Sequence, residues 1–350
     1  MTAPLDDRRL AAATLASLPG VTPARLDDLF ERWPDPRRCL AALRSGDRPD
    51  WVRAFDDASI ASVLRARAPH VFVAGDDDYP IREPLPQQPR VLLGDGARVD
   101  ALDRPRVAIV GTRAATPHGL ADARELGAFL ADTGFTIVSG LAIGVDGAAH
   151  EGALDAGGTV VGVVATGLDV VYPRRHARLF ARVREAGLIV GEHGYGVGPE
   201  AGRFPVRNRI IAALADAVVV VEATPKGGTR STVDRALEYA RPVLAIPGSR
   251  RNPAAAGCNA LLAEGATPLL EPTDVLVALD LAAGTTGWAR RAAPPDPDGT
   301  AVLRALAGEP ATIDQACARS GLTPARLAGA ARALERAGRL TRRHGLLWPL

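Results

Sequence analysis

The sequence predicts an α/β protein in which a doubly wound, mostly parallel sheet lies between a small helical N-terminal domain and a C-terminal winged helix. From about residue 105, short and almost wholly apolar β-branched segments alternate with longer helical segments. Such segments are typical of strands buried on both faces of a parallel sheet. The first 70 and the last 50 residues show helical spacing of apolar residues instead. We therefore predict domains at residues 1–75, 76–282 and 300–350, with a linker at 283–299.

Six segments are the predicted strands of the central domain, and the stretches between them are long enough for crossover helices. They are residues 106–111, 135–140, 159–164, 188–192, 217–223 and 242–248. Ligands of such sheets bind beyond the carboxyl ends of the strands.

The flanking domains are predicted from helix caps and breakers. Within residues 5–70, Pro19-Gly20 ends one helix and Thr22 caps the next. This SAM-like or helix–hairpin–helix-like arrangement either holds DNA phosphate or serves only for docking, which we favour. Residues 75–96 are predicted to be an irregular connector. In residues 300–350, Thr312 and Thr323 are predicted caps within three helices, and a terminal hairpin forms the wing.

The composition restricts the class of site. Hydrophobic residues make up 47% of the 350 residues and aromatic residues only 4%, so base stacking on aromatic rings is not expected to be the main binding device. Cys39, Cys258 and Cys317 lack metal-binding or disulfide spacing, which favours the cytoplasm. No membrane span, metal or cofactor is expected. Lys226 is the only lysine among 42 basic residues, so a phosphate site must use guanidinium groups and backbone amides.

Charge is distributed unevenly although the net charge is only +2. Residues 1–100 carry 14 arginines and 16 acidic residues, whereas residues 300–350 carry 8 arginines and 3 acidic residues. The C-terminal segment is therefore the basic one.

Two predicted strands end in candidate phosphate loops. The first ends in Gly111-Thr112-Arg113, ahead of a helix that opens at Thr116-Pro117 and whose amides attract an anion. The second is followed by a loop with Ser139, Gly140 and Gly144.

The helix after this second loop is expected to be capped by Asp146. The same residue lies four positions before His150. We interpret these two side chains as a hydrogen-bonded structural pair.

A third region has cations at predicted helix starts. Arg174 and Arg175 follow Tyr172-Pro173. A helix predicted to begin near Pro205 buries Val206, Ile210, Ile211 and Leu214 and carries Arg207, Asn208 and Arg209 in its first turn. Cations there oppose the helix dipole, which indicates a nearby anion.

The fifth predicted strand leads into Lys226, Gly227, Gly228 and Thr229 at the start of a helix. Taken together, the loops at one sheet edge predict a basic groove that follows a polyphosphate backbone.

These motifs resemble the DNA-processing protein A family (DprA, also called Smf) over residues 76–280. The matching segments are "YP" at 79–80, "VAIVGTR", "SGLAIGVDGAAHEGAL", "ATGLDVVYP", "FPVRNRIIAAL", "VVVVEA" with "GGTRST", "AIPG" and "GCNALLAEGA". In one departure, Arg230 stands where the family usually has an apolar residue.

The resemblance implies an extended Rossmann-like domain that binds single-stranded DNA, and a homodimer. It also implies that the protein helps load RecA recombinase onto DNA coated with single-strand binding protein, in natural transformation, without enzymatic activity. The residues expected to bind DNA phosphate are Gly111, Thr112, Arg113, Ser139, Gly140, Gly144, Arg174, Arg207, Asn208, Arg209, Lys226, Gly228 and Thr229.

Two alternatives stay open. The segment "KGGTRSTVDRALEY" is similar to the loop of the phosphoribohydrolases that cleave nucleoside monophosphates, with Glu222 or Glu238 assisting cleavage. The winged helix instead suggests a regulator that reads duplex DNA, with Arg326, Arg332 and Arg336 on the recognition helix, about residues 324–337.

Overall fold

The computed structural model describes residues 5–52, 55–67, 69–81, 83–283, 297–306, 309–336, 340–343 and 345–349. The chain forms two compact units, residues 1–131 with 135–270, and residues 271–350 with 132–134. Most of the predicted linker, residues 284–296, lies outside the described residues. The domain boundaries at 75 and 282 stay predictions.

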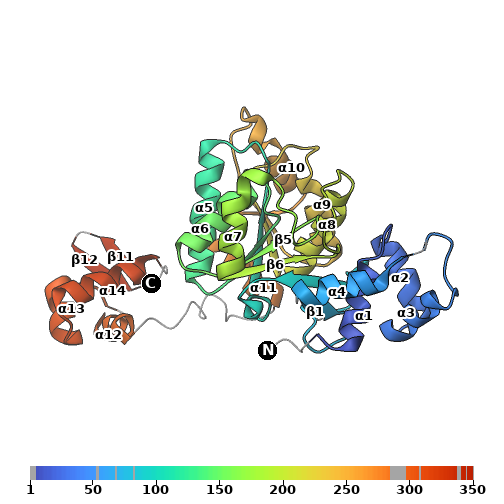
Figure 1. Cartoon of the computed structure of the whole chain (residues 1–350). Coiled ribbons are helices and arrows are strands. Elements are labelled where there is room, and N and C mark those ends of the chain that lie inside the picture. Colours follow the sequence, from blue (N-terminus) through green and yellow to red (C-terminus); the bar gives the residue numbers. More distant parts are fainter. Residues whose placement is uncertain are drawn as a thin grey trace. The chain divides into compact units, whose positions relative to one another are not determined.

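A nine-stranded sheet forms the centre of the first unit (Figure 1). Its strands in spatial order are β1 (His70–Val73), β2 (Val91–Asp95), β6 (Gly187–Gly191), β5 (Val160–Val163), β4 (Thr136–Ser139), β3 (Arg106–Val110), β7 (Ala217–Val220), β8 (Val243–Ala245) and β9 (Thr267–Pro268). The strands from β6 to β9 are parallel, whereas β1 and β2 are antiparallel to their neighbours.

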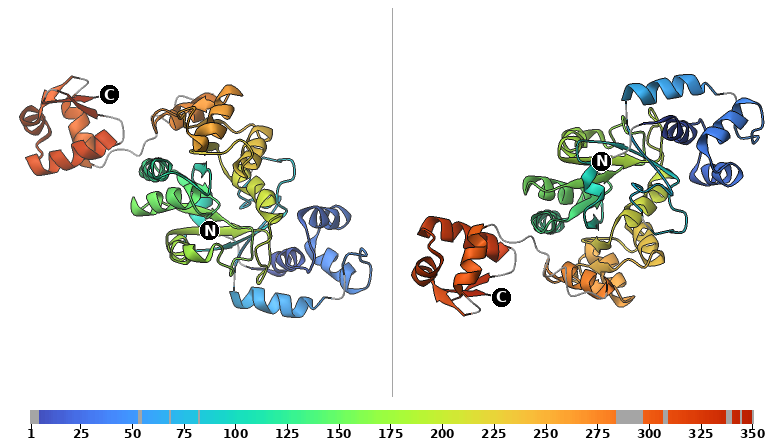
Figure 2. Two further views of the ribbon diagram at one scale, coloured as in Figure 1. Left: turned by 90° about the horizontal axis from the view of Figure 1, so that it is seen from above. Right: turned by 90° about the horizontal axis from the view of Figure 1, so that it is seen from below.

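Helices cover both faces of this sheet, as Figure 2 shows. One face carries α5 (Pro117–Asp132), α6 (Val145–Asp155) and α7 (Ala177–Ala186), and the other carries α8 (Arg203–Leu214) and α9 (Thr229–Glu238). The core between the sheet and α8 consists of buried valine, isoleucine and alanine side chains, which is why the strands read as continuous apolar runs.

The six predicted strands and the doubly wound fold are confirmed. The prediction of an irregular connector over 75–96 is wrong in part, because Val91–Asp95 forms β2. This strand pairs with β1 and β6. Its burial depends on those distant partners, which the local Pro and Gly content does not reveal.

The topology places β3 at the point where the direction of winding changes. From β3 the chain adds β4, β5 and β6 on one side, and then β7, β8 and β9 on the other. In doubly wound sheets the ligand site lies beyond the carboxyl ends of the strands at this point.

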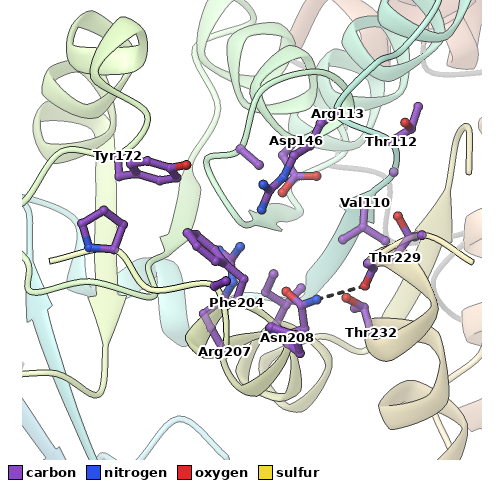
Figure 3. Close-up of a pocket in the computed structure, with 18 of the residues that line it drawn as sticks. Val110, Thr112, Arg113, Asp146, Tyr172, Phe204, Arg207, Asn208, Thr229 and Thr232 are labelled. Carbon is purple, nitrogen blue, oxygen red and sulfur yellow. Dashed lines mark hydrogen bonds between the residues drawn. The ribbon is translucent and has the colours of Figure 1, made fainter.

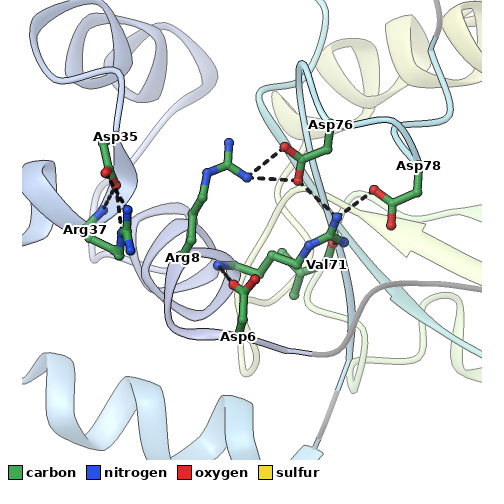
Figure 4. Close-up of polar contacts among 8 residues, drawn as sticks. Asp6, Arg8, Asp35, Arg37, Val71, Asp76 and Asp78 are labelled. Atoms are coloured by element: carbon green, nitrogen blue, oxygen red, sulfur yellow. Dashed lines mark hydrogen bonds and ion pairs between the residues drawn. The ribbon is translucent and has the colours of Figure 1, made fainter.

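Four helices precede the sheet, namely α1 (Asp7–Ala16), α2 (Pro23–Arg32), α3 (Pro36–Arg44) and α4 (Asp57–Arg67). Thr22 caps α2 as predicted, since its side chain accepts a hydrogen bond from the Arg25 amide. Helix α1 is attached to the sheet by Arg9, whose guanidinium donates to the Val71 carbonyl and to Asp76 and Asp78 (Figure 4).

The second unit contains the winged helix. Its elements are α11 (Asp274–Ala283), α12 (Pro297–Leu306), β10 (Ala311–Thr312), α13 (Ile313–Ser320), α14 (Pro324–Arg336), β11 (Leu340–Arg343) and β12 (Leu346–Pro349). Thr312 forms a capping box with Gln315, and Thr323 accepts a hydrogen bond from the Arg326 amide. Both predicted caps are confirmed, as are the three helices and the hairpin.

Replacing the buried Arg9 by alanine is expected to lower the free energy of unfolding by about 1–3 kcal/mol, because the buried Val71 carbonyl and Asp78 lose their donor while Asp76 keeps its ion pair with Arg8. Urea unfolding measures the change. The matched control is Arg37→Ala, which removes the exposed pair with Asp35 (Figure 4) and is expected to leave the midpoint where it is. Equal midpoints for both variants would contradict the structural role of Arg9 in attaching α1 to the sheet.

Candidate nucleic-acid interface

A pocket of about 610 Å³ opens at the carboxyl end of β3, at the predicted edge of the sheet. Seven of the predicted site residues line it, together with Tyr172, Phe204 and threonine hydroxyls (Figure 3). These seven are Gly111, Thr112, Arg113, Arg207, Asn208, Gly228 and Thr229. Residues more than 100 positions apart in the chain thus meet at one opening.

The loop after β3 presents an exposed cation on a fixed backbone. The Thr112 amide donates to the Glu222 carbonyl over 2.7 Å. A Cβ at Gly111 would lie 2.6 Å from Val145 Cγ2 and 2.7 Å from the Glu222 oxygen, so only glycine fits. Arg113 is exposed, and no ion pair to it occurs among the described residues.

Two aromatic rings lie beside this cation. The Arg113 guanidinium carbon is 5.0 Å from the centre of the Phe204 ring, within the range of a cation–π contact. The Tyr172 and Phe204 ring centres are 5.4 Å apart at an angle of 42°. Two aromatic rings thus lie at this pocket although aromatic residues are few in the chain. Each ring directly precedes a proline, which is the only local signal for them.

Arg207 lines the pocket with only a small part of its side chain exposed. Its side chain is buried and donates to the carbonyls of Gly140 and Val163, the latter a short contact. Burial lowers the pKa of Arg207 to about 10, and the nearby Asp146 carboxylate opposes that change. The guanidinium therefore stays charged at neutral pH and connects α8 to the ends of β4 and β5.

The loop after β4 uses its polar groups internally, contrary to the prediction that it cradles a phosphate. Ser139 is buried and its hydroxyl donates to the Ile109 carbonyl over 2.6 Å. The Gly140 amide donates to Asp146 over 3.0 Å. Gly144, at φ 87°, packs against the Thr112 carbonyl. These three residues support the pocket, and Ala142 is the residue of this loop that lines it.

Two further predictions about α6 are wrong. Gly144, and not Asp146, is the N-cap, and Asp146 lies in the first turn. The expected pair does not form either. Asp146 binds the Gly140 amide, whereas His150 Nε2 lies 3.2 Å from the Val161 carbonyl oxygen.

Helix α8 begins at Arg203, two residues before the predicted start. Arg207, Asn208 and Arg209 are therefore beyond its first turn, where the helix dipole no longer opposes their charge. Val206, predicted to be buried, is 39% exposed.

Arg209 is not a pocket residue. Its guanidinium is buried and donates to Glu192 over 2.6 Å. Burial raises the pKa of Glu192, and Arg209 opposes that rise. The Glu192 carboxylate thus neutralises the Arg209 guanidinium, and Arg209 is not available to bind DNA phosphate.

The loop between β7 and α9 is connected to α8 through Asn208. Asn208 Nδ2 donates to Ser231 Oγ over 2.8 Å and to the Gly228 carbonyl over 3.2 Å. Arg230 turns away to carboxylates, with ion pairs to Asp234 at 2.7 Å and Glu264 at 2.8 Å. The unusual arginine therefore stabilises the outer side of α9.

The remaining predicted cations, Arg174 and Lys226, are exposed outside the pocket lining. Within the described ranges neither forms an ion pair with a carboxylate. They stay candidates for contacts with a ligand that extends beyond the pocket.

The glutamates that a phosphoribohydrolase would need are used elsewhere. Glu222 is buried and accepts hydrogen bonds from the Thr116 amide over 2.8 Å and the Thr116 hydroxyl over 2.7 Å. The anion at the start of α5 is therefore the Glu222 carboxylate. The sequence had predicted that a ligand would supply this anion. Glu238 is exposed and pairs with Arg235. Neither carboxylate lines the pocket.

The recognition helix of the winged domain is only partly consistent with base reading. Arg326 binds Asp298 through two hydrogen bonds of 2.6 and 2.9 Å. Arg332 is exposed, and the side chain of Arg336 lies outside the described residues. Arg326, the first of the three predicted base-reading residues, is therefore already bound to a carboxylate of the protein.

Comparison with known proteins gives the family. Residues 70–280 match the family model described as DNA recombination-mediator protein A. The chain belongs to this family. Residues 288–345 also match the DprA winged helix domain. The family predicted from the motifs is thus confirmed.

Relatives agree with this assignment over most of the chain. A putative DNA processing protein DprA from Mycobacterium tuberculosis is 37% identical over 315 residues, which covers 85% of this chain and 80% of the relative. The DNA processing protein DprA from Streptococcus pneumoniae is 41% identical over 201 residues, 57% of this chain and 71% of the relative.

Two solved structures share the fold. The X-ray structure of DprA from S. pneumoniae has a TM-score of 0.59 at 33% identity and covers 73% of this chain and 98% of that one. The Helicobacter pylori DNA processing protein A has a TM-score of 0.54 at 30% identity and covers 60% of this chain and 95% of that one. The H. pylori structure gives insights into a unique single-stranded DNA binding mode of that protein.

The described residues offer neither a membrane span nor a metal site. No helix among them has both the length and the apolar character needed to cross a bilayer. They also contain no group of three His, Cys, Asp or Glu side chains able to hold a metal ion.

Replacing Arg209 by alanine is expected to lower the free energy of unfolding by about 3–5 kcal/mol, since Glu192 is left buried without its cation. The double variant Arg209→Met/Glu192→Leu is expected to be clearly more stable than the single one. Urea unfolding measures both. The exposed Arg175→Ala serves as control, and equal stability of Arg209→Ala and this control would contradict the buried pair.

Proposed function

We propose that this protein binds single-stranded DNA at the carboxyl edge of its sheet and helps load RecA recombinase onto that DNA in natural transformation and recombination. The observation that carries the proposal is the exposed Arg113 guanidinium on the Phe204 ring, with Tyr172 beside it. Family membership supports it, as does the single-stranded DNA binding mode of the similar H. pylori protein.

The pocket offers the two kinds of contact that a single strand needs. Arg113 supplies a bidentate donor for a backbone phosphate. Tyr172, 40% exposed, and Phe204 supply ring faces for unpaired bases. The bases of a duplex are already stacked on one another, so these faces favour a single strand. Thr229 and Asn208 add short polar contacts at the inner wall.

Exposed cations extend the surface beyond the pocket. Arg174 and Arg175 follow β5, which is two strand positions from β3. They come two and three residues after Tyr172, whose ring lines the pocket. Cations within the pocket and beside it can contact more than one phosphate, which favours a polynucleotide over a mononucleotide.

The proposed action on RecA is stoichiometric. A homodimer holds the strand by its phosphates, displaces single-strand binding protein and leaves adjacent nucleotides open to RecA. We place this activity in the cytoplasm, in keeping with three free cysteines.

Arg113→Ala is expected to weaken binding of labelled oligo-dT and to lower the slope of log affinity against log salt by about 0.7, the share of one phosphate contact. Fluorescence anisotropy at several salt concentrations measures both quantities. Arg38→Ala is the control, because it removes an exposed cation from α3. If Arg113→Ala and Arg38→Ala change the slope equally, Arg113 is not a phosphate ligand.

Wild-type protein is expected to shorten the lag before RecA assembles on DNA coated with single-strand binding protein, whereas Arg113→Ala is not. The time course of RecA-dependent ATP hydrolysis measures the lag. An unchanged lag with wild-type protein that binds oligo-dT would refute loading while leaving DNA binding in place.

A further inference from the structure

Two consecutive arginines, Arg250 and Arg251, lie in the loop that follows β8. Both are exposed, and neither belongs to an ion pair within the ranges that the structure describes. Most arginines of the first unit are paired with carboxylates, as Arg98, Arg124 and Arg184 are. Arg250 and Arg251 are therefore available to an external anion, as Arg174 and Arg175 are at the other end of the site.

The backbone of this loop is held in place. The Gly248 amide donates to Asn259 Oδ1 over 3.1 Å, and Asn259 Nδ2 donates to the Gly248 carbonyl over 3.0 Å. The Arg251 amide donates to Ser249 Oγ over 3.3 Å, and Asn252 caps the 3₁₀ turn Pro253–Ala255. Fixed backbone with free side chains is an arrangement suited to binding a charged ligand.

The strand order brings these arginines to the same edge as the pocket. Strand β8 pairs in parallel with β7, which pairs in parallel with β3. The loop after β8 therefore starts about 10 Å from the end of β3, on the side opposite β5. Lys226 is exposed in the loop after β7, between the two.

We propose that Lys226, Arg250 and Arg251 form a second phosphate-binding segment, which holds the single strand where it leaves the pocket on the β8 side. This inference rests on the proposed function. Arginine forks bind phosphate oxygens in pairs and lysine adds a point charge. The carboxylates of Asp234 and Glu264 do not compete, because Arg230 binds them.

The segment lengthens the footprint instead of forming a separate site. At about 3.4 Å per nucleotide, oligo-dT of two nucleotides is too short to bridge the roughly 10 Å between the pocket and the loop after β8, whereas oligo-dT of about 30 nucleotides reaches both. The contribution of the two arginines is therefore specific to the long ligand.

The test uses full-length Arg250→Gln/Arg251→Gln and both oligonucleotides. On the long one, the slope of log affinity against log salt is expected to fall by about 1.4, the share of two phosphates. On the short one it is expected to equal the wild-type slope. Arg250→Lys/Arg251→Lys is expected to restore most of the long-ligand slope, and thermal unfolding confirms that the exposed substitutions fold.

The matched control is Arg38→Gln/Arg65→Gln, which removes two exposed cations from α3 and α4. A wild-type slope on the long oligonucleotide for the Arg250/Arg251 variant would overturn the second segment, as would an equal loss for the control. Failure of wild-type protein to bind either oligonucleotide would instead overturn the proposed function, so the two failures are distinguishable.

Discussion

The buried guanidinium of Arg207 is the contact on which the carboxyl edge of the sheet depends. It binds the carbonyls of Gly140 and Val163, at the ends of β4 and β5, from a side chain on α8. Asp146 lies close enough to favour its charge and also holds the Gly140 amide. A Cβ at Gly140 would lie 2.5 Å from Arg207 Nη1 and 2.6 Å from Asp146 Oδ2, so this packing admits only glycine. An internal cation thus fixes the floor of the site that we propose to bind DNA.

Local patterns in the sequence were sufficient for the doubly wound fold and for six of the nine strands, but not for β1, β2 and β9. The apolar runs predicted the parallel strands, and Thr22 and Thr312 predicted helix starts, because strand burial and capping depend on a few neighbouring residues. The seven pocket residues were predicted from glycines, cations and polar residues at strand ends and at helix starts. The hydrogen-bond and ion-pair partners of the buried polar side chains were not predicted. Nothing local shows that Glu192 reaches Arg209, or that Glu222 reaches Thr116 across 106 positions.

Pairing, and not the number of arginines, decides which part of the surface can attract DNA. Acidic and basic residues nearly balance over the chain, and many arginines of the first unit bind carboxylates. The exposed cations at the sheet edge lack such partners among the described residues. A protein with a net charge near zero can therefore still present a local positive edge, since unpaired charges dominate the field close to them.

Hydrogen exchange with and without oligo-dT tests most directly whether this edge is the DNA-binding surface. We expect slower exchange on DNA binding in the loops that line the pocket, residues 111–116, 199–208 and 224–230, and no change in α2 and α3. Slower exchange confined to the winged helix, with these loops unaffected, would show that the strand binds elsewhere.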